Sequence, residues 1–277
     1  MEPSLEEIFG SYMSWKLDNQ TWIINFMNGT ENMYLLEGDE KALLIDTGYG
    51  VGNLRAYVEN LTDKPILVAN THYHPDHAAG NGEFEQVYMS KGAELDKASV
   101  ENPDMVPFDI TKLPHPDYEK VYVGDGDTIE LGNRTIEILD VKPAHCNSSL
   151  FFLDRSHRMF FCGDDMEAAQ VILFDHNQDI NYDLKTILDN FLENTERILS
   201  LSNEFDYLLP NHNGTPIAKS YLNDYIDLIH AIYNKEVEPD EKLNHRYIEM
   251  DPQASKLCRV RGKNGSIITY REQLRNL

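Results

Sequence analysis

The stretch that most constrains this chain is residues 70–81, NTHYHPDHAAGN, in which four side chains able to bind a metal fall within six positions: His72, His74, Asp76 and His77. Alternate side chains of an extended segment point the same way, so the first two imidazoles can reach one ion. Asp76 and His77 follow a proline that blocks continued regular structure, and they can turn toward a second ion. Imidazole and carboxylate together suit zinc, and also iron or manganese. The stretch therefore predicts a metal site.

Four ligands do not complete two metal sites, so the chain must supply more. His145 follows the apolar segment IEILDV, Asp164 follows FFCG, and His212 follows YLLPN. Each segment resembles a strand, and functional groups commonly lie on loops held at the ends of strands. We therefore expect these three side chains to join the cluster in space.

Charge and composition limit the kind of partner. The chain has 24 basic and 47 acidic residues, which gives a formal net charge of −23. Nucleic acids and anionic membranes would be repelled, so a small-molecule substrate is expected. The first residues, MEPSLEEIFG, lack signal-peptide features, and no apolar run is long enough for a membrane span. Three widely spaced cysteines predict no disulfide framework and favour the cytoplasm. The oligomeric state stays open.

The order of apolar segments predicts an α/β sandwich with helices on the outside. Strand-like segments at 21–26, 32–38 and 41–48 precede a helical pattern at 51–61, and a second run of strands precedes helices at 183–201 and about 222–233. We expect residues 1–277 to form a single domain. A proline-rich loop at about 101–118 interrupts this pattern, and a C-terminal hairpin is expected at about 257–270. Residues 234–256 have no assigned role.

The ordered motifs IDTG, THYHPDH, AH, GD and PNHNG, from about residue 20 to residue 217, resemble those of the metallo-β-lactamase superfamily. The resemblance implies a four-layer αββα sandwich with the site at one edge, between the sheets. It assigns a first ion to His72, His74 and His145, a second ion to Asp76, His77 and His212, and both ions to Asp164 as a bridging carboxylate. It also makes Asp46 a supporting residue that orients the ligand loop.

The resemblance implies two divalent ions, with zinc expected and iron or manganese as alternatives. A hydroxide bridging the ions would attack the substrate, and Asp76 would orient the water or accept its proton. The ligand set is similar to that of glyoxalase II-type thioesterases, which favours hydrolysis of an ester, thioester or lactone. Glu167 stands where quorum-signal lactonases commonly carry tyrosine, which weakens that subgroup. The alternatives are a phosphodiesterase or sulfatase acting at the same centre, and a non-catalytic binding protein.

Candidates for the substrate pocket lie beside the ligands or on the proline-rich loop: Tyr73, Phe108, His115, Tyr118 and Asn213. The competing interpretation for each is ordinary loop packing. For Tyr73 the alternative is a side chain that points away from the ions, because its neighbours on both sides point toward them.

Overall fold

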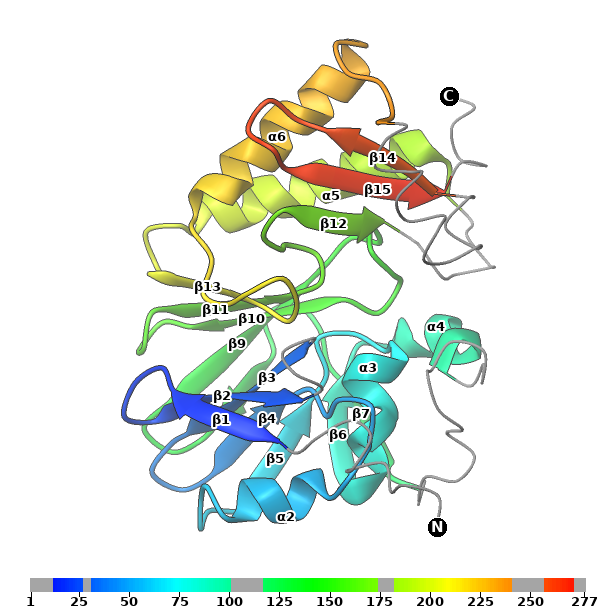
Figure 1. The fold of residues 1–277 in the computed structure, drawn as a ribbon. Coiled ribbons are helices and arrows are strands. Elements are labelled where there is room, and N and C mark those ends of the chain that lie inside the picture. Colours follow the sequence, from blue (N-terminus) through cyan, green and yellow to red (C-terminus); the bar gives the residue numbers. More distant parts are fainter. Residues whose placement is uncertain (1–11, 27–30, 101–116, 174–181, 241–256, 272–277) are drawn as a thin grey trace, which may run out of the picture.

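The structure is a computed structural model that describes residues 12–26, 31–100, 117–173, 182–240 and 257–271. Figure 1 shows two halves stacked on one another, with a sheet on the inner side of each half and helices on the outer side. Three clusters of buried apolar residues lie between these layers. One cluster packs the first sheet against its helices, one lies between the two large sheets, and one lies beneath the C-terminal helices.

The first half is built on a seven-stranded sheet with the strands in sequence order: β1 (Met13–Lys16), β2 (Thr21–Phe26), β3 (Glu31–Glu37), β4 (Ala42–Ile45), β5 (Ile66–Ala69), β6 (Gln86–Met89) and β7 (Glu119–Tyr122). The strands from β1 to β4 pair antiparallel, and those from β4 to β7 pair parallel. Parallel pairing requires crossover connections, which contain α2 (Leu54–Glu59), α3 (Pro75–Ala78), a 3-10 helix (Ala79–Glu83) and α4 (Ala93–Val100). The carboxyl ends of β4 and β5 therefore meet at one edge of this sheet.

The second half contains a five-stranded sheet in the order β13 (Tyr207–Pro210), β11 (Met159–Gly163), β10 (Leu150–Asp154), β9 (Thr135–Asp140) and β8 (Thr128–Glu130). A smaller sheet joins β12 (Gln170–Leu173), β15 (Ile267–Arg271) and β14 (Leu257–Arg261). The helices α5 (Leu184–Ser200) and α6 (Ser220–Tyr233) cover both sheets in Figure 1. The predicted αββα sandwich is confirmed by this layering.

The apolar pattern predicted the central elements because they are buried on both sides. All residues of β4, β10 and β11 are buried, so these strands are almost continuously apolar. The helix predicted at 183–201 is α5, and Asp183 caps its first turn by accepting a hydrogen bond from the amide of Thr186 at 2.7 Å. The predicted helix near residues 222–233 is α6.

Three short strands, β1, β6 and β12, were not predicted from the sequence, because each has only four residues and none is fully buried. Pro75 does more than end the extended segment. It is the first residue of α3, a position where the missing amide hydrogen costs nothing. The C-terminal hairpin of β14 and β15 is extended by the parallel partner β12. Of the proline-rich loop, only residues 117 and 118 lie among the described residues.

Candidate metal centre

The seven predicted ligands follow the ends of four different strands. His72 and His74 lie on the loop after β5, Asp76 and His77 lie on α3, and His145, Asp164 and His212 follow β9, β11 and β13. The edges of the two large sheets meet here, so each half contributes part of the cluster. His72 and His77 are 1% and 0% exposed, which places their rings inside the protein.

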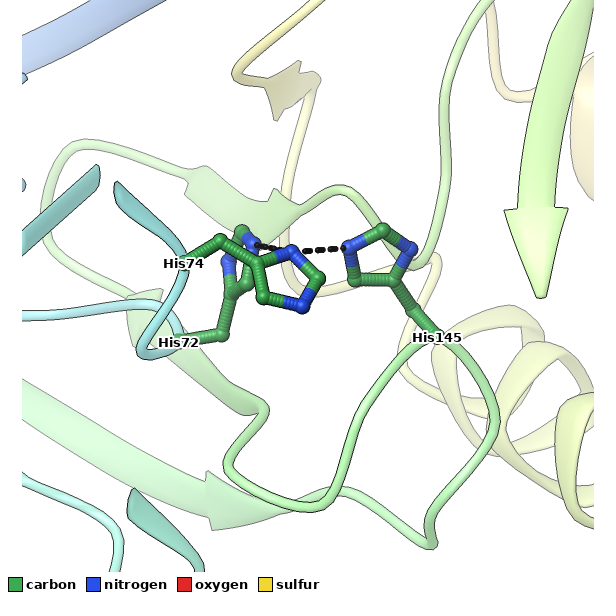
Figure 2. Close-up of side chains that lie close together, drawn as sticks. All are labelled: His72, His74 and His145. Carbon is green, nitrogen blue, oxygen red and sulfur yellow. Dashed lines mark hydrogen bonds between the residues drawn. The ribbon is translucent and has the colours of Figure 1, made fainter. Parts of the chain in front are cut away.

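One group of imidazoles consists of His72, His74 and His145. The Nδ1 atom of His74 lies 3.1 Å from Nε2 of His72 and 3.0 Å from Nε2 of His145. Figure 2 shows the three rings converging, two from the motif loop and one from the loop after β9. Three ring nitrogens this close together suit a shared cation, because lone pairs facing one another would otherwise repel.

A second group consists of Asp76, His77, Asp164 and His212. The Nε2 atom of His212 lies 3.2 Å from Oδ2 of Asp76 and 3.3 Å from Nε2 of His77. Oδ2 of Asp164 lies 3.4 Å from Nε2 of His77 and 3.4 Å from Nε2 of His212. Zinc bonds to nitrogen and oxygen of about 2.0–2.1 Å imply about 3.3–3.4 Å between the ligand atoms of a tetrahedron. These separations fit one divalent ion.

Asp164, a member of the second group, also faces the first group. The same Oδ2 atom also lies 3.8 Å from Nε2 of His72 and 3.7 Å from Nε2 of His145. Its Oδ1 atom is buried and has no hydrogen-bond partner among the described residues. One oxygen of this carboxylate thus faces four ring nitrogens, two from each group. The chemistry of the donors fits divalent metal ions.

Hydrogen bonds hold the rings so that the converging nitrogens carry lone pairs. Nδ1 of His145 lies 2.6 Å from the carbonyl oxygen of Ile172 on β12, and Nδ1 of His77 lies 3.1 Å from Oδ2 of Asp46. Both oxygens can accept a hydrogen bond from a protonated Nδ1, which leaves the lone pair of Nε2 available to a metal.

Asp46 is completely buried and organises the motif loop. Its Oδ1 accepts a hydrogen bond from the amide of Thr71 at 2.7 Å, and its Oδ2 accepts others from the Thr71 hydroxyl and the Asn211 side chain, both at 2.7 Å. The φ angle of Asp46 is +65°, a left-handed conformation that aspartate tolerates better than most residues. This one carboxylate links the ends of β4, β5 and β13.

The two groups differ in how strongly their imidazoles hold protons. Burial lowers the pKa of His72 well below its usual value, and the neighbouring rings of His77 and His74 add to the effect. Burial also lowers the pKa of His212, but the negative charges of Asp164 and Asp76 outweigh it and raise that pKa to about 10. His77 follows the same logic, and the same two carboxylates raise its pKa. The two carboxylates therefore favour protonation of these rings when no metal is bound, and a cation that binds at Nε2 would displace the proton.

The structure describes three of the five predicted pocket residues, and they lie in different surroundings. Tyr73 is buried in the cluster between the first sheet and its helices, and its hydroxyl lies 3.0 Å from that of Tyr118, to which Asn81 also donates a hydrogen bond. Asn213 is exposed beside His212. Phe108 and His115 lie outside the described residues.

Several supporting residues were not singled out from the sequence. Thr71 and Asn211 each stand directly before a predicted ligand, so their positions in the motifs were the available signal. Glu167 is 5% exposed and accepts a hydrogen bond from the side chain of Asn213. Burial, together with the charge of Asp164, raises the pKa of Glu167 well above its usual value. The carbonyl of Ile172 carries no signal, because any residue could supply it.

Comparison with known proteins identifies the family. The family model described as the metallo-beta-lactamase superfamily matches residues 28–202, which is more than half of the chain. The chain therefore belongs to the metallo-beta-lactamase superfamily, as the motifs predicted. In the described residues, no helix is both long enough and apolar enough to span a membrane.

Relatives and solved structures agree with this assignment. An acyl-coenzyme A thioesterase MBLAC2 from Gallus gallus is 26% identical over 165 residues, which are 51% of this chain and 59% of that protein. A hydroxyacylglutathione hydrolase from Erythrobacter litoralis is 31% identical over 99 residues, 36% of this chain and 33% of that protein. The chain thus matches less than two thirds of either relative, and both are hydrolases by name, in agreement with the predicted class. A metallo-beta-lactamase from Pontibacter korlensis superposes with a TM-score of 0.57 at 17% identity, over 79% of this chain and 99% of that one, which shows the shared fold.

Proposed function

We propose that this protein is a hydrolase that cleaves a small-molecule thioester at a centre of two divalent metal ions. The observation that carries the proposal is the pair of donor groups sharing Oδ2 of Asp164. His72, His74 and His145 would hold one ion, and Asp76, His77 and His212 the other. Zinc suits this set of nitrogen and oxygen donors best, with iron and manganese as alternatives.

Two ions held in this way would supply an activated water and would neutralise negative charge developing on the substrate oxygen. The protein supplies the position and the direction of approach. The side chains of His212 and Asp76 are 20% and 21% exposed, whereas that of Asp164 is 8% exposed. Water and substrate would therefore reach the centre from the side of Asp76 and His212.

Asp76 is suited to orient the attacking water or to accept its proton. Burial raises the pKa of its carboxyl, but the charges of His77 and His212 outweigh this and lower it well below the usual value. The ionised carboxylate is an acceptor only, so it can take up a hydrogen bond from water in a fixed direction.

The thioester preference is supported by the two groups of relatives, whose names specify acyl-coenzyme A thioesterase and hydroxyacylglutathione hydrolase activities. Simple esters, lactones, phosphodiesters and sulfate esters are the competing substrates. The three cysteines are buried and form no disulfide, which supports a reducing compartment such as the cytoplasm.

A substrate panel with metal analysis tests the proposal. We expect about two metal equivalents per chain and faster turnover of acyl thioesters than of lactones, phosphodiesters or aryl sulfates. Asp76→Ala should reduce thioester hydrolysis by about 100-fold or more, because it removes both a ligand and the water acceptor. Asp189→Ala is the matched control, because that carboxylate lies on the outer surface of α5 and pairs with Lys185. Full activity of Asp76→Ala, or preferential cleavage of phosphodiesters or sulfate esters, would overturn the proposal.

A further inference from the structure

A buried carboxyl that belongs to neither donor group lies beside the second one. Glu31 is 1% exposed, and neither of its carboxyl oxygens has a hydrogen-bond partner among the described residues. Buried polar groups are almost always hydrogen-bonded, because leaving one unsatisfied destabilises the fold. An unpartnered buried carboxyl of this kind calls for a functional explanation.

The position of Glu31 in the fold brings it to the metal edge of the sheet. It is the first residue of β3, and β3 runs antiparallel to β4, so the start of β3 lies near the end of β4, where Asp46 follows. The next residue, Asn32, exchanges hydrogen bonds of 2.7 and 2.6 Å with Asn211, which directly precedes His212.

The carboxyl of Glu31 lies against the turn that supports His77. Its Oε1 atom occupies the space in which a side chain at Gly48 would begin, and Gly48 has a φ of +64°. Thr47, the residue before Gly48, donates its amide hydrogen to the carbonyl oxygen of His77 at 2.8 Å. Only glycine leaves room for the carboxyl here, so the turn and Glu31 fit one another.

The charged groups that act most strongly on Glu31 are those of the second donor group. Burial and the charge of Asp76 raise its pKa well above the usual value, whereas His77 and His212 oppose this shift. A divalent cation between those side chains would favour the carboxylate form, because a bound cation is the largest charge in such a site.

We propose that Glu31 is a positioning residue of the second ion, whose unpartnered buried carboxyl strengthens cation binding by Asp76, His77, His212 and Asp164 without itself being required as a ligand. The inference rests on the metal centre of the proposed function, though not on the choice of substrate. The unsatisfied carboxyl of Glu31 lowers the stability of the metal-free fold, because an apolar side chain of similar length would fill the same space without an unsatisfied polar group.

Zinc titration of the metal-free protein against a chelating dye tests this role. Glu31→Gln and Glu31→Met should weaken binding of the second zinc ion by about 10- to 100-fold, the range typical of residues around a metal site, because each removes the buried carboxyl charge near that ion. The first zinc ion should bind as in the native protein. Thermal unfolding of metal-free Glu31→Met should occur at a higher temperature than that of the native protein, which a purely structural role for the carboxyl would not produce.

Glu37→Gln is the matched control, because Glu37 is the last residue of the same strand, at the opposite end from the metal edge, where its carboxyl accepts a hydrogen bond from Thr62 at 2.6 Å. Native affinity for the second ion in both Glu31 variants would overturn the inference, as would an equal loss in Glu37→Gln. If Glu31→Met fails to fold, Glu31→Gln decides the question, because it keeps the shape of the side chain. If the native protein binds two zinc ions but cleaves no thioester, the result contradicts the proposed substrate alone. If it binds fewer than two zinc ions, the result contradicts both the proposed function and the role of Glu31.

Discussion

Replacing Asp46 by asparagine should separate the stability of the fold from its affinity for metal. The carboxylate is completely buried and accepts hydrogen bonds from the Thr71 amide, the Thr71 hydroxyl, Nδ1 of His77 and the Asn211 side chain. Asparagine tolerates the left-handed backbone conformation at this position, so the change alters the chemistry of the side chain and leaves the backbone in place.

The geometry sets the expected cost. Three donors converge on Oδ2 and one on Oδ1, so the amide oxygen of asparagine should take the Oδ2 position and leave its NH2 facing the amide hydrogen of Thr71. Loss of that hydrogen bond to a charged acceptor costs about 1.5–3 kcal/mol. The three remaining bonds lose the ionic part of their strength, about 1 kcal/mol each. The free energy of unfolding of the metal-free protein should therefore fall by about 5 kcal/mol, measured by urea denaturation.

The same substitution should weaken zinc binding by about 10- to 100-fold, because a neutral amide oxygen in place of the carboxylate makes the ring of His77 a less basic metal ligand. Asp154→Asn provides the control. Asp154 is also completely buried and accepts a 2.6 Å hydrogen bond from Nε of Arg134. Its loss should destabilise the fold by a similar amount, about 3–5 kcal/mol, and leave zinc affinity unchanged. Native zinc affinity in Asp46→Asn, or an equal loss of affinity in Asp154→Asn, would refute the reasoning.

Three further predictions concern the second donor group. Affinity for the second zinc ion should fall at least about tenfold for each pH unit from 9 to 7, because His212, with a pKa of about 10, must release a proton to bind metal, and the raised pKa of His77 acts in the same direction. Equal affinities in chelator titrations at pH 7 and 9 would contradict this. Glu167→Ala should weaken binding of the second ion, because it removes the acceptor that holds Asn213 beside His212, whereas Glu167→Gln keeps an acceptor and should bind this ion as the native protein does in the same titration. Weakened binding in Glu167→Gln would rule out the hydrogen bond as the cause. Gly48→Ala should lower the free energy of unfolding by at least about 1–2 kcal/mol, because the φ of +64° at this position disfavours a side chain and the carboxyl of Glu31 fills the space. An unchanged midpoint of urea denaturation would contradict the contact between Gly48 and Glu31.

Sequence reasoning succeeded where the signal was local. The buried strands and amphipathic helices carry strong apolar patterns, so the four layers could be predicted. The motif loop concentrates ligand-type residues in six positions, and the structure brings these residues together with the three later candidates. It failed for residues whose role depends on partners far along the chain. The side chain of Asn211 donates a hydrogen bond to Asp46 from 165 positions away in the sequence, and neither residue type predicts that pairing.

Glu31 illustrates the same limit in another form. In the segment NGTENMY it looks like a polar residue at the edge of a strand, a position that is usually exposed. Its burial follows from the packing of β3 beside β4 and from the glycine turn that covers its carboxyl. Tyr73 is the opposite case, because the alternation of the motif loop already indicated that it points away from the histidines, and its ring lies in the core.

The arrangement of ligands also implies that metal binding holds the two halves of the sandwich together. The first group takes His72 and His74 from one half and His145 from the other, and Asp164 reaches both groups from the second half. At the opposite end of the same interface, Arg134 donates hydrogen bonds to the backbone carbonyls of β3 and of the turn before β2 while it pairs with Asp154 on β10. Besides the covalent chain, the hydrogen bonds of Arg134 to the first half thus join the sheets at one end, and ions held by the two donor groups would join them at the other. Because a ligand that binds only the folded state stabilises it in proportion to the logarithm of its concentration, chelation should loosen the metal end of the interface first and leave the end held by Arg134 intact.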